Sequence, residues 1–142
     1  MQTERADNDD AQLRQNADQG NAAAQFILGT MYYDGQAASG ILKGVQQDYA
    51  QAVTWYRKAA DQGHVRAQFN LGLMYGRGQG VPQDFVEAHK WINLAAARAS
   101  IDDEKRYSEA RDTVAISMTP DQLAIAQRRA SEWMVAFEKR QK

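Results

Sequence analysis

Part of this chain is repeated. The sequence ADQG at 17–20 recurs at 60–63, and AQF at 24–26 recurs at 67–69, an offset of 43 (67 minus 24). From residue 44 onward the matches lie 36 positions apart, as GV at 44–45 and 80–81 shows (80 minus 44). The first copy is therefore longer by seven residues (43 minus 36), most simply 37–43. A repeat with a period of this length predicts stacked structural units.

Both halves of each unit are predicted to be helices. Apolar residues fall at helical spacing in 24–32 and 67–75, and again in 49–60 and 85–96. Two aspartates precede the second pair of segments, at positions where an N-cap side chain accepts hydrogen bonds from free backbone amides, namely Asp48 and Asp84. The repeated unit is therefore expected to be a helix pair.

The segment YGRGQGVPQD at 75–84 has glycine at every second position over its first six residues. A dinucleotide-binding G-x-G-x-x-G loop beginning at Gly78 would need a third glycine where Gln83 stands, and it would follow a strand. We therefore expect a turn between two helices here and not a phosphate-binding loop.

Two glycines, Gly29 and Gly72, occur inside predicted helices, where glycine costs about 1 kcal/mol relative to alanine. We expect them to allow close approach of the paired helix, opposite small residues such as Ala52 and Ala88. The tryptophans of the two units, Trp55 and Trp91, are expected to be the largest buried side chains.

The repeated residues follow the pattern A-x-x-x-L-G-x-x-Y, then G-x-G-V-x-x-D, then A-x-x-W and A-A-x-x-G. This pattern resembles the Sel-one-like repeat, a relative of the tetratricopeptide repeat. It covers residues 23–63, with the inserted loop 37–43, and residues 66–99. The resemblance implies an all-α fold, a short right-handed superhelix (solenoid) of stacked antiparallel helix pairs that serves as a protein-binding scaffold.

The segments on either side complete one predicted domain, 1–142. Residues 9–20 resemble the second helix of a preceding unit and are expected to act as an N-terminal capping half-repeat. Residues 102–142 are expected to form a C-terminal helical hairpin that closes the stack. Thr119 and Pro120 indicate a helix start within it, as N-cap and first-turn residue.

No motif in the sequence predicts catalysis, a cofactor or a metal. The chain has no cysteine, and its two histidines, His64 and His89, lack partner histidines nearby in the sequence. We expect both histidines to be solvent-facing or edge residues. No serine stands in a G-x-S-x-G or S-x-x-K context, and the acidic clusters lack the ligand spacing of a calcium loop.

The formal net charge of −1 gives no attraction for nucleic acid, and no apolar run is long enough to cross a membrane. The first twenty residues lack the apolar core of a signal peptide, but they could be what remains after its removal. The compartment stays open: cytoplasmic, or periplasmic or secreted if such a peptide was cleaved.

The resemblance implies that the first helix of each unit lines a concave surface where ligands lie. The predicted partner-binding residues there are Phe26, Thr30, Tyr33 and Asp34 in the first unit and Arg66, Phe69, Leu73 and Arg77 in the second. Phe26 and Phe69 have an alternative role, packing between neighbouring helices. In the inserted loop Ile41 and Leu42 are a second candidate, either reaching a partner or folding back on their own unit.

The function that these observations predict is a non-enzymatic adaptor for a protein or peptide partner. One alternative is an enzyme, since some cysteine-rich relatives have been described as binding or hydrolysing β-lactams. Another is self-association in place of a monomer. The first twenty residues carry five acidic and two basic groups and residues 128–142 carry five basic and two acidic groups, so opposite ends could attract.

Overall fold

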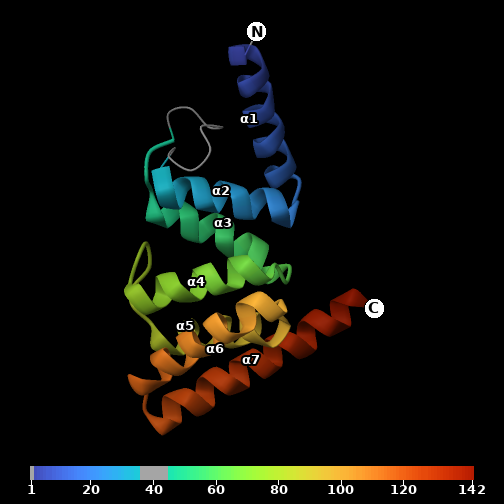
Figure 1. Ribbon diagram of the computed structural model, residues 1–142. Helices are drawn as coiled ribbons and strands as arrows, with labels where there is room; N and C mark the ends of the chain where they lie inside the picture. The colour runs from blue at the N-terminus through green and yellow to red at the C-terminus, as the bar shows by residue number, and fades with distance from the viewer. Residues whose placement is uncertain (1, 36–44) are drawn as a thin grey trace.

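The computed structural model describes residues 2–35 and 45–142, with side chains from residue 9 onward. Across these residues the chain forms helices and no strand (Figure 1). The helices are α1 (Gln2–Asp18), α2 (Ala22–Asp34), α3 (Tyr49–Asp61), α4 (Val65–Arg77), α5 (Phe85–Arg98), α6 (Ile101–Ile116) and α7 (Pro120–Gln141). The predicted all-α fold is confirmed.

The helix starts follow from local hydrogen bonds. The side chains of Asp48 and Asp84 accept from the backbone amides of Gln51 and Glu87, each at 3.1 Å, which confirms both predicted N-caps. Helix α7 begins with a reciprocal capping box, in which Thr119 accepts from the Gln122 amide and the Gln122 side chain accepts from the Thr119 amide. Each cap satisfies an amide that the helix itself cannot pair.

The glycine-rich segment is a turn, as predicted. Gly78 ends α4 with φ 66° and Gly80 follows with φ 73°, both in the left-handed region that disfavours other residues. The backbone of Tyr49 lies so close to Gly80 that a Cβ there would overlap it. This segment therefore carries the chain from α4 to α5 and packs against the preceding unit.

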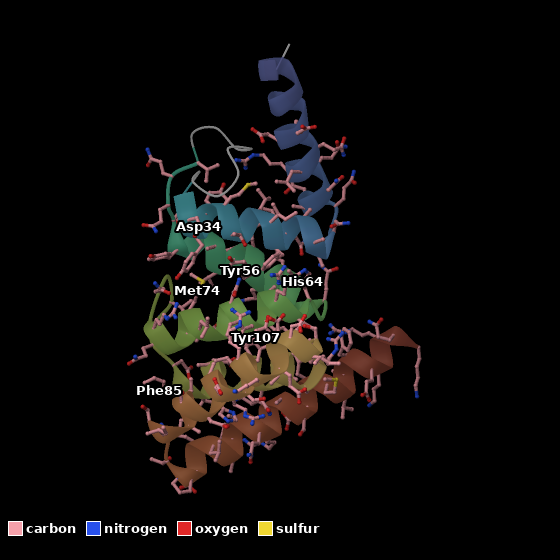
Figure 2. All side chains as sticks on the ribbon, in the orientation of Figure 1. Asp34, Tyr56, His64, Met74, Phe85 and Tyr107 are labelled. Atoms are coloured by element: carbon pink, nitrogen blue, oxygen red, sulfur yellow. The ribbon has the colours of Figure 1, made fainter. Side chains whose placement is uncertain are left out.

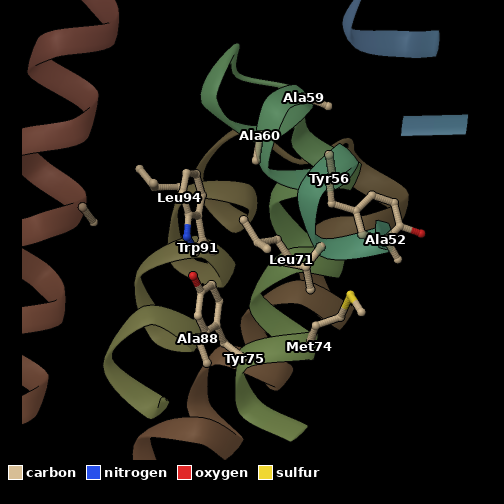
Figure 3. Packing of buried hydrophobic residues seen from close by; sticks show 13 residues of the cluster. Ala52, Tyr56, Ala59, Ala60, Leu71, Met74, Tyr75, Ala88, Trp91 and Leu94 are labelled. Carbon is tan, nitrogen blue, oxygen red and sulfur yellow. The ribbon is translucent and has the colours of Figure 1, made fainter. Parts of the chain in front are cut away.

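Helices α2 and α3 form one antiparallel pair and α4 and α5 the next, and the pairs stack with α4 against α3 (Figure 1). The largest buried cluster joins α3, α4 and α5, with Tyr56, Leu71, Met74 and Trp91 at its centre (Figure 3). At the C-terminal end both α6 and α7 pack against α5. The structure is a short α-solenoid closed by two further helices.

The two mid-helix glycines do allow close approach, but not opposite alanine side chains. A Cβ on Gly29 would lie 2.5 Å from the Tyr56 ring, and a Cβ on Gly72 would lie 2.6 Å from Ile92 Cγ1. Tyr56 and Ile92 are equivalent residues, 36 positions apart. Each glycine therefore makes room for a large side chain of the paired helix. Ala88 does face Gly72, through its carbonyl oxygen 3.1 Å from the same Cβ position, whereas the three atoms nearest to a Cβ on Gly29 all belong to Tyr56 and not to Ala52.

A buried glutamine joins each unit to the helix before it. Gln68 donates from Nε2 to the carbonyl of Ala60, and Gln25 donates in the same way to Ala17, both at 3.1 Å. Both acceptors lie in the last turn of a helix, where carbonyls lack intrahelical partners. Because the two bonds are equivalent, α1 stands to α2 as α3 stands to α4.

Trp91 is 3% exposed, as expected, and Trp133 of α7 packs edge-on against it with ring centroids 6.0 Å apart. Trp55 is only half-buried, with the Lys58 ammonium 4.5 Å from its ring centroid, so the expectation of deep burial is wrong for this residue. The Phe137 ring lies against Gly63 in the α3–α4 turn. Helix α7 thus reaches from α5 back to the preceding unit.

Candidate functional site

A cleft of about 280 Å³ lies between α2 and α4. We call it the first cleft. Its lining residues are Thr30, Tyr33, Asp34, Tyr56, Asn70, Leu73 and Arg77. The structure thus brings together five residues that the sequence predicted for the concave face: Thr30, Tyr33, Asp34, Leu73 and Arg77.

Hydroxyl groups meet at the floor of the first cleft. Thr30 Oγ1 lies 3.1 Å from the Phe26 carbonyl, to which it donates, and 3.0 Å from the Tyr56 hydroxyl. Burial raises the pKa of Tyr56, which its hydrogen bonds to Thr30 and Asn70 partly oppose, so the phenol stays protonated at neutral pH. Along the boundary of α2 and α4, Asp34 lies at one edge, Tyr56 near the middle and His64 toward the other edge (Figure 2).

Tyr33 closes one side of the first cleft. Its ring lies 5.1 Å from that of Tyr49, and its hydroxyl donates to Gln79 Oε1 at 3.3 Å. Gln47 also donates to the Tyr33 carbonyl at 3.0 Å. Contacts from α3 and from the α4–α5 turn therefore hold this side chain in place.

A second cleft, of about 320 Å³, lies between α4 and α6. Its lining residues are Gly72, Leu73, Gly76, Arg77, Phe85, Ala110, Thr113, Val114 and Ser117. Leu73 and Arg77 line both clefts, so the two clefts lie next to each other across α2, α4 and α6. We call the two together the concave groove.

The contribution of α6 to this groove was missed from the sequence. The repeat pattern fades after residue 99, so no family position pointed to Ala110, Thr113 or Val114. A signal was nevertheless present, because the offset of 36 carries Arg77 onto Thr113. Extending the repeat period beyond the recognisable motif would have found it.

Three other predicted residues lie outside the two clefts. Phe69 is 4% exposed and stacks on Tyr107 of α6, with ring centroids 3.9 Å apart. It therefore packs between helices and does not belong to the predicted set of partner-binding residues. Phe26 is half-buried and stacks on His64 at 4.7 Å, and the exposed Arg66 places its guanidinium 5.9 Å from the Phe26 ring centroid. Ile41 and Leu42 lie outside the described residues.

The prediction that the histidines face solvent or an edge is wrong for His89, whereas His64 is half-buried at the start of α4. His89 is 4% exposed on α5, and burial, with the nearby Arg111, lowers its pKa. His64 is the N-cap of α4, where Nδ1 accepts from the Ala67 amide at 3.2 Å. Burial, with the nearby Arg66, lowers the pKa of His64 as well.

No three acidic or histidine side chains gather as metal ligands in the part of the chain that the structure describes. Of the helices described, none combines the length and the apolar character needed to cross a bilayer. The groove residues carry hydroxyl, amide, aromatic, aliphatic, guanidinium and, at Asp34, carboxylate groups. Such a set can bind a chain of mixed polarity through hydrogen bonds, packing and charge.

The family model for the Sel1 repeat matches residues 22–64 and 65–100, more than half of the chain. The chain belongs to the Sel1 repeat family. Sel1 repeats generally mediate protein interactions, and proteins of this fold are generally non-enzymatic scaffolds. The matched segments overlap the two helix pairs α2–α3 and α4–α5.

Solved structures agree with this Sel1 repeat assignment. The chain is 33% identical to c5321, a protective antigen of uropathogenic Escherichia coli strains with an SLR fold, at a TM-score of 0.74. The match covers 91% of this chain but 27% of that one. A Sel1 repeat protein from Oxalobacter formigenes is 37% identical at a TM-score of 0.59, over 68% of each chain. A search of curated proteins gives no significant match.

Proposed function

We propose that this Sel1 repeat chain is a peptide-binding adaptor whose concave groove holds a segment of a partner protein. The single observation that supports this most is the pair of adjacent clefts across α2, α4 and α6, which share Leu73 and Arg77 in their linings. Two adjacent clefts of mixed chemistry fit a linear segment better than a small compact ligand.

The first cleft offers contacts that suit a peptide backbone. Asn70 carries both a donor and an acceptor, which match the carbonyl and amide of a peptide group. Thr30 and Tyr56 add hydroxyls on the same floor, 3.0 Å apart. The two hydroxyls already bond to each other and to the Phe26 carbonyl, so a partner would meet their remaining lone pairs and the Asn70 amide.

The test uses the whole chain and a random peptide library displayed on phage. Peptides selected on the wild type are synthesised, and their affinities are measured by fluorescence anisotropy. We expect the double variant Tyr33→Ala with Arg77→Ala to lower affinity by about tenfold or more, because both side chains line the first cleft.

The matched control is Gln51→Ala with Arg128→Ala, which removes one exposed polar residue and one exposed arginine from α3 and α7, away from the groove. The control is expected to bind like the wild type. Circular dichroism melts show whether each variant is folded. Equal affinity of the folded groove variant and the wild type would contradict the proposed function.

A further inference from the structure

The two repeats differ in one side chain that decides how open the concave groove is. The offset of 43 places Gly76 of α4 where α2 has Tyr33, and the offset of 36 places Phe85 of α5 where α3 has Tyr49. Both units thus present an aromatic residue at the start of their second helix. Only the first unit has a second aromatic residue to cover it.

In the first unit the cover is in place. Tyr33 packs on Tyr49 with ring centroids 5.1 Å apart and an interplanar angle of 44°. In the second unit Gly76 has no side chain, and the half-buried Phe85, labelled in Figure 2, lines the second cleft. The position that a tyrosine occupies in one repeat thus borders a cleft in the next.

The rest of the second cleft is suited to an apolar group with one charge beside it. Leu73, Ala110 and Val114 supply aliphatic walls. Arg77 is the single charged residue of its lining, is exposed, and makes no hydrogen bond or ion pair with another described residue. A carboxylate is the group that a guanidinium binds best, through two parallel hydrogen bonds.

We infer that the second cleft receives an aromatic side chain of the partner peptide, which packs on Phe85 as Tyr33 packs on Tyr49. Arg77 then pairs with an acidic residue near that aromatic residue in the same peptide. This inference rests on the proposed function and specifies its partner: a segment that combines an aromatic anchor with a carboxylate. Aromatic anchors in such pockets dominate the binding energy of many interfaces.

The first test fills the cleft with the side chain of the other repeat. Gly76→Tyr keeps the helix, because a Cβ at Gly76 meets only Ala88 Cβ, at the ordinary contact distance of 3.6 Å. We expect peptides selected on the wild type to bind this variant about tenfold more weakly or worse. The control Gln127→Tyr adds the same side chain at an exposed position of α7, outside both clefts, and is expected to bind like the wild type. If Gly76→Tyr does not fold, Phe85→Ala removes the packing surface instead, with the same expected loss.

The second test reads the charge preference. Selection on the wild type is expected to enrich peptides with an aromatic residue close to Asp or Glu. Selection on Arg77→Glu is expected to keep the aromatic residue and to replace the acid by Lys or Arg. Enrichment of the same acidic peptides on both proteins would overturn the assignment of Arg77.

These outcomes separate the inference from the function on which it rests. If the double variant Tyr33→Ala with Arg77→Ala weakens binding and Gly76→Tyr does not, the groove binds peptides but the aromatic site is wrong. If no peptide is enriched on the wild type, or neither variant weakens binding, the proposed function fails together with the inference.

Discussion

His64 shows how much one residue can contribute to the contact between repeats. Its Nδ1 caps α4 by accepting from the Ala67 amide, while its ring stacks on Phe26 of the preceding unit. In the first repeat the equivalent residue is Asn21, which caps α2 through its side-chain oxygen at 2.9 Å from the Ala24 amide. The second repeat therefore uses a titratable cap where the first uses a neutral one.

This difference predicts a pH-dependent stability. The folded chain holds the pKa of His64 below its ordinary value of 6.5, so the unfolded chain takes up the proton first as the pH falls. The free energy of unfolding then decreases below about pH 6.5. Protonated Nδ1 also cannot accept the capping hydrogen bond, and a positive charge at a helix N-terminus is unfavourable.

We expect His64→Asn to lose less stability than the wild type between about pH 7.5 and pH 5.5, in urea unfolding followed by circular dichroism. Asparagine is a strong N-cap without a proton to gain. His89, whose pKa is also lowered, keeps its part of the pH dependence in both proteins. Identical pH dependence of the two proteins would contradict a role for the His64 cap.

At the residue level, the sequence allowed prediction of what depends on near neighbours. The caps Asp48 and Asp84 bond to an amide three positions on, so their role is readable from local order alone. The burial of His89 and of the Gln25 and Gln68 amides depends on other helices. Polar residues are mostly exposed, and only the tertiary partner shows that these are not.

Among the helices, glycine positions determine how closely the two helices of a pair approach each other. Gly29 lies against Tyr56 and Gly72 lies against Ile92, so closely that a Cβ on either glycine would overlap its neighbour. Gly76 lies one turn further along α4, in the lining of the second cleft, where a Cβ would make only an ordinary contact with Ala88 Cβ. Two glycines of the same helix thus have different structural roles. Gly72 allows close helix packing, and Gly76 leaves room for the second cleft.

We therefore expect opposite effects from two alanine substitutions in α4. Gly72→Ala forces Ile92 and the α5 backbone to move, which costs about 1–3 kcal/mol of overpacking and exceeds the gain in helix propensity. Gly76→Ala makes only an ordinary contact with Ala88 Cβ, at 3.6 Å, and is expected to stabilise the chain by up to about 1 kcal/mol. Thermal and urea unfolding of the two variants measure both. A stabilising Gly72→Ala would refute the packing argument.

Helix existence was predictable because apolar periodicity and caps agree in each segment. Which residues the helices contact was harder to predict. The expectation that alanines face the mid-helix glycines overlooked the residue one turn further along the paired helix, and Trp55 was assumed buried by analogy with Trp91. Its position in the stack differs, because α7 covers Trp91 through Trp133.

For the whole molecule, α7 is the element that ties separate units together. Ala126 and Ala130 are buried, Trp133 reaches Trp91, and Phe137 stacks on Trp133 at 4.9 Å while covering Gly63. Arg140 continues the contact by donating to the Asp61 carbonyl at 3.2 Å. A single helix thus contacts both α5 and the turn between α3 and α4.

Removal of residues 119–142 is therefore expected to lower the midpoint of thermal unfolding by well over 10 °C or to prevent cooperative folding, because several large apolar side chains lose their cover. Tryptophan fluorescence is expected to shift to longer wavelength as Trp91 meets water. A matched chain that keeps α7 but carries Val135→Ser and Lys139→Ser on its exposed face is expected to melt like the wild type. A truncated chain with an unchanged melting curve would show that α7 does not hold the stack.

The position of the groove could be predicted in part for the same reason that the fold could. Thr30, Tyr33, Asp34, Leu73 and Arg77 follow from the helical register fixed by the repeated Leu-Gly pairs. Phe69 could not be separated from them by sequence, since its burial depends on Tyr107 in a helix where the motif has faded. The extent of the groove could not be predicted, because it depends on where α6 packs.

The glutamine bond between neighbouring units has a consequence for how such chains can grow. Donor and acceptor are both carried within residues 22–64, as Gln25 near one end and Ala60 near the other. Suppose that a duplicated copy of that segment were placed directly after residue 64. The copy's equivalent of Gln25 would then donate to the existing Ala60 carbonyl, and the copy's equivalent of Ala60 would accept from Gln68. Gene duplication could thus lengthen the array, and with it the surface offered to a ligand, without a new mutation at either seam.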